Sequence, residues 1–396
     1  MSEGIPGLRL LARDPASPDD GAFVENGVRL GGGSFHVFAG LCAVDTRDNL
    51  ERAFAALARA GVVTARAGAW KPRTSPYDFQ GRGAACLPEV FEAAGKHGIK
   101  LVAMELTRAA QLEELAAALD AAGGPTSVLV QVGTRNAQNF ELLKEVGAQQ
   151  RFPVLLKRGM GITLSESLLA AEYVAKAGNP RVAFCLRGVR THLGEPQRNL
   201  VDFAQVPAVK RLTRMPVCAD PSHAVGPRVR SREGLDDLHH VAAQAVIAGA
   251  DMLLVDVHPR PEEALCDGPQ ALTLDELPRF LADVNVARAA WEERRRAAAS
   301  IPAPPAADAA VQFEALRRRF EAIDATLVAL LAERMLASRA MVHAKSALKL
   351  PVVDAARERD AAAARRALGD KLGVDAELLD RVFAEVVEWS RRLQGG

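Results

Sequence analysis

Eight short apolar segments separated by helix-like stretches limit the possible folds of this chain more than any other feature. The segments span residues 35–41, 61–66, 99–106, 127–133, 152–158, 181–187, 215–220 and 250–257. Between them lie Ala-, Leu- and Glu-rich stretches with helical spacing, and one of these ends at Gly178, a typical helix terminator. Eight alternating units in about 250 residues predict an α/β fold, the (β/α)8 TIM barrel. An open doubly wound sheet is the alternative.

A change in composition near residue 294 marks the end of this repeating region. Residues 294–312, RRRAAASIPAPPAADAAVQ, are rich in Pro and Ala and predict an extended linker rather than a helix or a strand. We therefore divide the chain into an N-terminal extension (1–30), a barrel (31–290), a linker (291–312) and a helical domain (313–396). A short hairpin or a cap on the barrel is our expectation for residues 1–30.

Charge and cysteine content exclude several classes of function. A net charge of +1 gives no overall basic surface for nucleic acid or an anionic membrane, and no apolar run approaches the roughly 20 residues that cross a bilayer. The N-terminal residues include acids and prolines where a signal peptide needs an apolar stretch. The five cysteines form no CxxC pair, which favours free thiols or a metal ligand. We therefore expect a cytoplasmic protein that binds neither nucleic acid nor membrane.

Polar residues gather where the predicted strands end. They are Cys42, Arg66 with Lys71, Glu105, Arg135, Lys157 with Arg158, Arg187 with Arg190, Asp220 with His223, and Asp256 with His258. In a barrel these positions meet at one face, where active sites are built. Several converging cations predict a substrate set with more than one phosphate or carboxylate group, because such groups need several charge-assisted hydrogen bonds. Surface ion pairs are the alternative for any single cation.

A metal site is a second possibility at the same face. Cys42, His223 and the acids of residues 255–270, VDVHPRPEEALCDGPQ, could form a mixed sulfur, nitrogen and oxygen site for a divalent metal. Taken singly, a buried Cys is usually a packing residue. Spacing alone does not decide between the two interpretations, because the ligands come from distant segments.

Five motifs in the correct order resemble DAHP synthase, in the class related to KDO-8-phosphate synthases. They are KPRTSPYDFQG (71–81), QVGTRNAQNFELL (131–143), PVLLKRGM (153–160), DPSHAVG (220–226) and the 255–270 segment. The resemblance implies condensation of phosphoenolpyruvate with erythrose 4-phosphate, and release of inorganic phosphate, at the entry to aromatic amino-acid biosynthesis.

The resemblance also implies roles for individual residues. The phosphate of phosphoenolpyruvate would be held by Arg135, Lys157 and Arg187, and its carboxylate region by Arg66 and Lys71, with Lys71 also close to the reacting carbons. Erythrose 4-phosphate would contact Arg73, Thr74, Ser75, Arg198 and Asn199. A divalent metal (Mn, Co, Zn or Fe) would be held by Cys42, His223, Asp256 and Asp267. The metal would polarise the aldehyde oxygen or position a water molecule.

The chain departs from the family pattern at several of these motifs. Asp256 replaces Glu, Leu186 replaces an acid in the CLRG motif, Leu41 and Asp45 alter the GLCAVD turn, and Thr134 replaces Ala. Two alternatives follow. The barrel would use another aldose phosphate, or it would be a non-catalytic scaffold that regulates the helical domain.

The last 84 residues predict three helices. Apolar residues at three- and four-residue intervals mark a long amphipathic helix: Phe313, Leu316, Phe320, Ile323, Leu327, Leu330 and Leu331. Pro351 and Gly373 interrupt the pattern. Arg334 and Lys345 lie almost three full turns apart and face the same way, which would suit a solvated cationic face or a binding site. A thin three-helix core favours dimerisation or docking on the barrel.

The polar residues of this tail resemble those of all-helical chorismate mutases. The matching positions are Arg317, Arg334, Lys345, Asp354, Arg357, Glu358, Ser390 and Gln394. The resemblance implies rearrangement of chorismate to prephenate without a cofactor, in an intertwined homodimer. Arginines, including the partner subunit's Arg317, would clamp two carboxylates, Lys345 and Gln394 would donate to the ether oxygen, and Glu358 would hold the hydroxyl. The fusion suggests that prephenate or chorismate inhibits the barrel through the tail.

Overall fold

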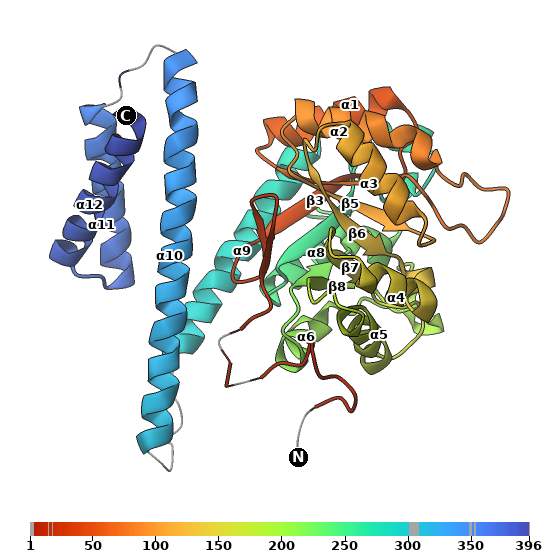
Figure 1. The fold of residues 1–396 in the computed structure, drawn as a ribbon, viewed down its shortest axis with the longest axis horizontal. Coiled ribbons are helices and arrows are strands. Elements are labelled where there is room, and N and C mark those ends of the chain that lie inside the picture. Colours follow the sequence, from red (N-terminus) through yellow and green to blue (C-terminus); the bar gives the residue numbers. More distant parts are fainter. Residues whose placement is uncertain are drawn as a thin grey trace. The chain divides into compact units, whose positions relative to one another are not determined.

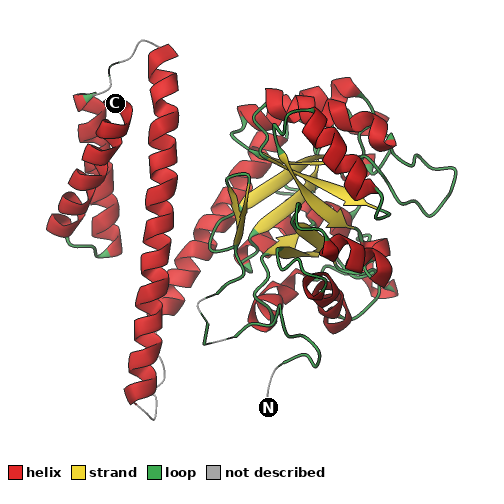
Figure 2. Cartoon of the chain, viewed as in Figure 1, coloured by secondary structure: helices red, strands yellow, loops and turns green. Residues whose placement is uncertain are grey.

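The chain folds into two compact units, which divide between residues 302 and 303. The computed structural model describes residues 4–14, 16–17, 19–300, 309–347, 351 and 354–395. The first unit is a closed barrel of eight parallel strands surrounded by helices (Figure 1; Figure 2). The prediction of a (β/α)8 barrel is therefore confirmed, and the open-sheet alternative is wrong.

Each predicted apolar segment corresponds to one barrel strand. The strands are β3 (His36–Leu41), β4 (Thr64–Ala67), β5 (Leu101–Leu106), β6 (Ser127–Val132), β7 (Val154–Lys157), β8 (Val182–Leu186), β9 (Val217–Ala219) and β10 (Met252–Asp256). Neighbours in sequence pair in parallel, and β10 closes the barrel by pairing with β3, with Met252 opposite His36. All eight carboxyl ends therefore meet at one face.

One or two α-helices follow each barrel strand. They are α1 (Arg47–Arg59), α2 (Leu87–Lys96), α3 (Gln111–Ala121), α4 (Phe140–Ala148), α5 (Leu164–Lys176), α6 (Val206–Leu212), α7 (Pro221–Val225), α8 (Asp237–Ile247) and α9 (Leu277–Ser300). Local sequence fixes several of their ends. Thr163 and Glu166 form a capping box at the start of α5, and Gly178 takes a φ of +123° just after its end.

Side-chain alternation along the strands builds two apolar layers. Val37, Ala39 and Leu41 face outward into the layer between strands and helices, whereas Phe38 faces into the barrel. The barrel interior is closed at its amino-terminal end by the antiparallel hairpin β1 (Phe23–Glu25) and β2 (Val28–Leu30), whose Val28 and Leu30 join the inner layer. The expected hairpin is present, and it leaves only the opposite end of the barrel open.

The extended conformation predicted for residues 294–312 is wrong for its described parts. Helix α9 continues to Ser300, and the next helix begins at Ala309. The run RRRAAA consists of strong helix formers, so the helix propagates until the prolines begin. Residues 301–308 lie outside the described residues.

The second unit is helical, as predicted. It contains α10 (Ala309–Ala347), α11 (Ala355–Leu372) and α12 (Ala376–Gly395), with breaks near Pro351 and at Gly373. Gly373 takes a φ of +67°, a left-handed conformation that ends α11. Arg366 on α11 and Asp380 on α12 form an ion pair of 2.7 Å between the two helices.

Candidate functional site

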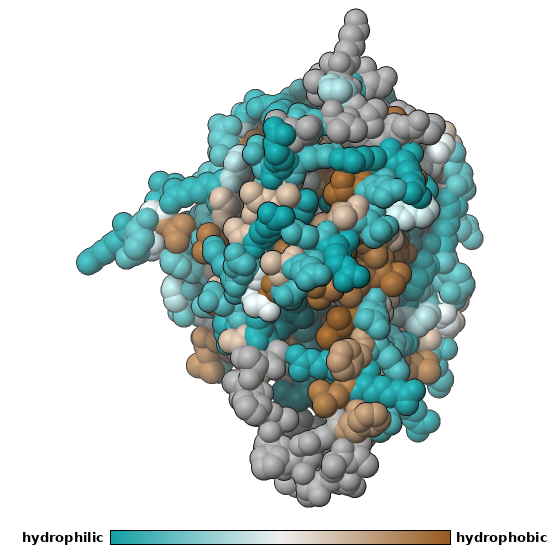
Figure 3. Space-filling model, turned by 90° about the vertical axis from the view of Figure 1, so that its left-hand side faces the viewer, coloured by the Kyte–Doolittle hydropathy of each residue, from teal (hydrophilic) through white to brown (hydrophobic). Residues whose placement is uncertain are grey.

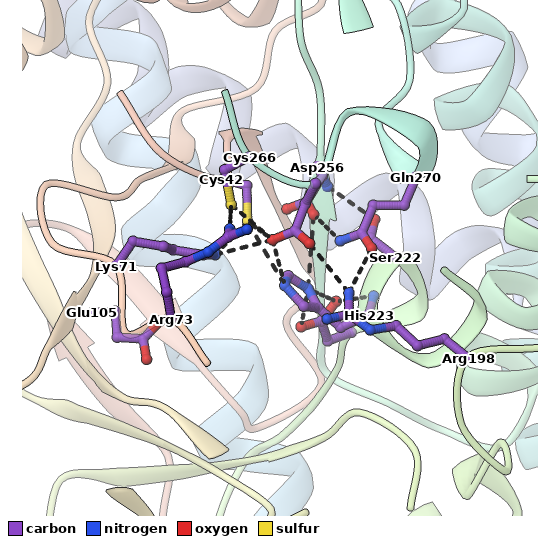
Figure 4. A network of polar contacts seen from close by, with 12 residues as sticks. Cys42, Lys71, Arg73, Glu105, Arg198, Ser222, His223, Asp256, Cys266 and Gln270 are labelled. Carbon is purple, nitrogen blue, oxygen red and sulfur yellow. Dashed lines mark hydrogen bonds and ion pairs between the residues drawn. The ribbon is translucent and has the colours of Figure 1, made fainter. Parts of the chain in front are cut away.

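Four potential metal ligands converge at the open end of the barrel. Cys42 follows β3, His223 lies in α7, Asp256 ends β10, and Asp267 precedes a 3-10 turn, Gly268–Gln270. Their ligand atoms all lie within 4.8 Å of one another. Figure 4 shows Cys42, His223 and Asp256 of this group close together. Cys42 Sγ is 3.1 Å from Asp267 Oδ2 and 3.7 Å from His223 Nε2. One thiol, one imidazole and two carboxylates suit a borderline divalent metal.

Asp220 orients the imidazole of His223 toward this cluster. It caps α7 by accepting the His223 backbone N–H at 3.0 Å, and its Oδ1 lies 3.1 Å from His223 Nδ1. With Nδ1 engaged, Nε2 faces Cys42 and Asp267. Although burial opposes a charged imidazole, the Asp220 carboxylate raises the pKa of His223 to about 10. Such carboxylate–histidine pairs hold metal-binding imidazoles in place.

Asp256 is held on both sides by other side chains. One carboxylate oxygen forms a buried ion pair with Arg66, and the other accepts a hydrogen bond from Gln270. Its backbone N–H donates to Ser222 Oγ at 2.9 Å. Arg66 is therefore engaged with a candidate metal ligand and does not line the neighbouring cavity.

A cavity of about 200 Å³ opens beside the cluster, and most of its charged lining is cationic. The cations are Lys71, Arg73, Arg135, Lys157, Arg187 and Arg198, and the acids are Asp78, Glu105 and Asp267. The predicted convergence of cations from separate strand ends is therefore present. Some have protein partners: Lys157 pairs with Asp220 at 2.5 Å, and Arg198 with Asp267 at 3.2 Å.

Arg187 differs from the other cations. It is 2% exposed, and its Nε and Nη1 have no hydrogen-bond partner among the described residues. Burial lowers the pKa of this guanidinium. Burying a charge without a partner is costly, so this geometry indicates that a bound anion completes the site.

The loop of residues 71–81 contributes unevenly to the cavity. Arg73 and Thr74 line it, and Arg135 Nη2 donates to Thr74 Oγ1 at 3.2 Å. Ser75 does not line it, and its Oγ instead accepts the backbone N–H of Tyr77 at 3.3 Å. Asn199 also points elsewhere, because its Nδ2 donates to the backbone carbonyl of His223 at 2.7 Å.

Three residues belong to this site although the motifs do not assign them a role. Glu105 lines the cavity, and Asp220 orients His223. Both end predicted strands, so strand position could have identified them. Cys266 accepts from Arg73 Nη1 at 2.8 Å and lies 3.0 Å from Asp267 Oδ2. No feature of the sequence separates it from a packing residue.

Among the predicted mutase residues whose side chains are described, Ser390 is buried and the others are exposed or half-buried. Glu358 pairs with Arg391, which lowers its pKa, and Lys345 and Asp354 also influence that pKa. Arg334 is half-buried, and its Nε has no partner among the described side chains. Arg317 is exposed, 3.8 Å from Glu321.

Two other predicted mutase residues make local backbone contacts. Asp354 accepts the backbone N–H of Arg357 at 3.1 Å, and the Ser390 hydroxyl donates to the Val386 carbonyl at 2.8 Å. The side chain of Gln394 lies outside the described residues.

A closed barrel with a cation-lined cavity beside a Cys-His-Asp-Asp cluster defines a (β/α)8-barrel enzyme that acts on anionic substrates. Residues 16–291 match the DAHP synthetase I family, and residues 316–395 match chorismate mutase type II. The chain belongs to the DAHP synthetase I family and carries a chorismate mutase domain after its barrel, so both resemblances are confirmed.

The barrel is similar to aldolases of two kinds. The phospho-2-dehydro-3-deoxyheptonate aldolase of Thermotoga maritima is 39% identical over 267 residues, which cover 67% of this chain and 73% of that protein. A crystal structure of a phospho-2-dehydro-3-deoxyheptonate aldolase (DAHP synthase) from Thermotoga maritima matches with a TM-score of 0.63 and 36% identity, over 72% of this chain and 78% of that one. A 2-dehydro-3-deoxyphosphooctonate aldolase of Nitratidesulfovibrio vulgaris is 29% identical over 264 residues, covering 63% and 90%. None of the described helices is long and apolar enough to span a bilayer.

Proposed function

We propose that this bifunctional enzyme condenses phosphoenolpyruvate with erythrose 4-phosphate in its barrel and rearranges chorismate to prephenate in its helical unit. The single observation that carries the first reaction is Arg187. Its buried, partly unpartnered guanidinium lines a cavity that adjoins the potential metal ligands. A phosphorylated substrate supplies the missing negative charge and hydrogen-bond acceptors.

Within the barrel, the phosphate of phosphoenolpyruvate is held by Arg135, Lys157 and Arg187. Lys71 lines the same cavity, and its Nζ is 2.6 Å from Sγ of Cys42, a potential metal ligand. We assign Lys71 a position beside the reacting carbons. Arg66 contributes through Asp256, which it holds in place, rather than by direct contact with substrate.

The acceptor aldehyde binds on the side of the cavity formed by the loop of residues 71–81. Arg73 and Thr74 of this loop line the cavity, Arg198 lines it from the segment between β8 and α6, and these three residues hold the phosphate. Ser75 has no contact with the cavity and supports the loop instead. This assignment keeps the two phosphates on separate sets of cations, which limits their mutual repulsion.

A divalent metal would be held by Cys42, His223, Asp256 and Asp267, and Mn, Co, Zn and Fe all suit this donor set. When bound, the metal supplies Lewis-acid polarisation of the aldehyde oxygen. Glu105 is the carboxylate of this cavity that has no cationic partner within ion-pair distance among the described residues. We propose that Glu105 accepts a proton from the water molecule that the condensation consumes.

In the helical unit, Arg334, Arg357 and the partner subunit's Arg317 clamp the two carboxylates of chorismate. Lys345 and Gln394 donate to the ether oxygen, and Glu358 holds the hydroxyl, without a cofactor. Asp354 supports the site by accepting a backbone hydrogen bond at the start of α11. Ser390 supports it by donating to the Val386 carbonyl within α12.

A homodimer formed through the helical unit completes this site. Large apolar side chains are exposed along α10, among them Phe313, Phe320, Leu327, Val328 and Leu336. Figure 3 shows apolar side chains among hydrophilic ones on the side of the molecule that faces the viewer. A soluble protein rarely leaves so many exposed, and a second copy would cover them. We place the enzyme in the cytoplasm.

Measuring both activities on purified full-length protein, with and without added divalent metal, tests this proposal. We expect metal-dependent phosphate release from phosphoenolpyruvate and metal-independent formation of prephenate. A panel of aldose phosphates tests the alternative acceptor, since preference for another sugar would replace erythrose 4-phosphate. Absence of phosphate release with every aldehyde would support a non-catalytic barrel.

A further inference from the structure

The backbone that follows Arg187 is held by a buried carboxylate from another segment of the chain. Arg187 comes directly after β8, and the next residue, Gly188, donates its backbone N–H to Asp202 Oδ1 at 2.8 Å. Gly188 has a φ of +83°, and a Cβ at this position would lie 2.7 Å from Cβ of Asn199. The chain therefore turns here with no room for a side chain, and Asp202 fixes the peptide group that joins Arg187 to Gly188.

Asp202 is itself held firmly in the protein interior. It is 6% exposed, and its other carboxylate oxygen accepts a hydrogen bond from Arg158 Nη1 at 3.0 Å. Arg158 follows β7 and also donates to Gln205 and to the Ile162 carbonyl. Neither Asp202 nor Arg158 lines the cavity. Asp202 can therefore influence a bound anion only through the groups that it holds in place.

Arg187 depends on its backbone for orientation, because its guanidinium is only partly held by the protein. Its Nε and Nη1 have no hydrogen-bond partner among the described residues. An arginine side chain has several rotatable bonds, and fixing them costs conformational entropy. The backbone before Arg187 is fixed by Asp220, whose N–H donates to the Leu186 carbonyl at 2.8 Å. The hydrogen bond from Gly188 to Asp202 fixes the backbone on the other side.

We propose that Asp202 is a positioning residue that orients the Arg187 guanidinium for the phosphate of phosphoenolpyruvate. This inference deepens the proposed function and rests on its assignment of that phosphate to Arg187. By holding the Arg187 backbone in one orientation, Asp202 reduces the entropy that the side chain loses when the substrate binds. Removal of the Asp202 carboxylate therefore weakens binding of the substrate, although every group that contacts the substrate is still present.

A second buried acid with the same bonding pattern lies at the opposite end of the barrel and provides a matched control. Asp251 precedes β10, accepts the Val217 backbone N–H at 2.8 Å and pairs with Lys210 at 2.8 Å. Burial raises the pKa of both Asp202 and Asp251. Asp251 borders a separate cavity and does not line the one that contains Arg187. Substitution of Asp251 therefore removes the same kinds of bonds without changing the position of Arg187.

The test measures phosphoenolpyruvate binding to full-length variants by isothermal titration calorimetry, at a fixed Mn²⁺ concentration and without an acceptor aldehyde. Asp202→Ala should weaken binding at least about 10-fold, the loss expected when a hydrogen bond to a charged group is poorly aligned. Asp202→Asn keeps an oxygen that accepts the Gly188 N–H, so it should bind nearly as well as the wild-type protein. Asp251→Ala should also bind normally. In rate measurements, Asp202→Ala should raise KM for phosphoenolpyruvate and leave KM for the acceptor unchanged.

Two double variants separate positioning from general destabilisation. Asp202→Ala leaves Arg158 as an unpaired buried charge, which destabilises the fold, so it is also combined with Arg158→Met to remove both charges. This variant still lacks an acceptor for the Gly188 N–H and should bind phosphoenolpyruvate as weakly as Asp202→Ala. Asp202→Ala combined with Arg187→Ala should bind no more weakly than Arg187→Ala alone, because Asp202 acts through Arg187.

Several results would overturn this inference while leaving the proposed reaction intact. They are wild-type affinity in Asp202→Ala, equal losses in Asp202→Ala and Asp251→Ala, Asp202→Asn binding as weakly as Asp202→Ala, and a full additional loss when Asp202→Ala is added to Arg187→Ala. If the affinities change as expected but no aldehyde supports phosphate release, the proposed reaction is wrong and the role of Asp202 stands. Failure of the wild-type protein to bind phosphoenolpyruvate would reject both.

Discussion

At the scale of single residues, the most informative side chain is a buried cation whose hydrogen-bond donors are not all satisfied by the protein. Arg187 is buried at the end of β8 and lacks partners for two of its donor atoms among the described residues. Such a group lowers the stability of the ligand-free protein and is useful only when an anion binds.

Arg187→Ala should therefore separate stability from activity. We expect synthase activity to fall about 100-fold or more, because a buried charge contact to the substrate is lost. The melting temperature without ligand should stay equal or rise, and stabilisation by phosphoenolpyruvate should disappear. Arg181→Ala is the matched control, since Arg181 pairs with Glu25 at 2.8 Å, far along the strand from the site. It should lower the melting temperature and keep activity.

Asp220→Asn tests how the imidazole of His223 is oriented. The amide keeps a hydrogen-bond acceptor but removes the charge that faces Nδ1. Metal affinity, measured by competition with a chelator, should fall about 10- to 100-fold. Asp202→Asn changes another buried acid at this face, which pairs with Arg158 at 3.0 Å, and should leave metal affinity unchanged. Equal losses in both variants would contradict the proposed role of Asp220.

At the scale of helices and strands, helix ends carry much of the local specificity. Asp236 begins α8 by accepting the backbone N–H of His239 at 3.2 Å, and it also pairs with Arg228 and with the His239 ring. Burial opposes its charge, but these hydrogen bonds and the Arg228 charge lower the pKa of Asp236 overall.

A lowered pKa in the folded state gives a stability that depends on pH in a defined direction. The contribution of Asp236 is present above its unfolded pKa of about 4 and is lost as pH falls through the folded value. Asp236→Asn should lower the free energy of unfolding at neutral pH by about 1 kcal/mol and flatten its decline below about pH 4. Denaturant unfolding from pH 7 to pH 3 checks this, with Asp237→Asn as the control. An unchanged slope would refute it.

The exposed apolar face of α10 predicts that substitutions on this face disrupt the proposed dimer. Phe320 and Leu327 are 67% and 53% exposed and lie two turns apart on one face. The double change Phe320→Glu and Leu327→Glu should convert the proposed dimer to a monomer and reduce mutase activity about 100-fold, since each site needs the partner subunit's Arg317. Light scattering and both activity assays measure the outcome. Val286→Glu on α9, at an equally exposed position, should change neither.

At the scale of the whole molecule, two units with separate chemistry share one chain. The division between residues 302 and 303 leaves the barrel with its own closed core. The proposed coupling of the units is therefore testable by removing one of them.

Deletion of residues 311–396 should leave synthase activity close to that of the full chain and abolish mutase activity. If the helical unit carries the inhibitory signal, prephenate should inhibit phosphate release in the full chain and have no effect after the deletion. Initial rates at several prephenate concentrations check both statements. Inhibition that persists in the shortened protein would place the effector site in the barrel.

The sequence by itself determined the architecture and most of the site. Short apolar segments indicated the eight strands, and helical spacing indicated the surrounding helices and the tail. The polar residues at the strand ends predicted the face where the strands meet. These features are local, because side-chain periodicity and helix propensity act over a few residues. The linker prediction failed for the same reason: Ala and Arg extend α9 to Ser300 despite the nearby prolines.

Only the tertiary structure decided which polar groups face the cavity and which pair with each other. Arg66 turns to Asp256, Ser75 turns into its own loop, and Cys266 reaches Cys42 from the far end of the barrel sequence. Barrel closure between β10 and β3 brings these segments together, and burial then favours the pairing of opposite charges such as Arg66 and Asp256. Such pairings depend on distances between remote segments, which no local pattern records.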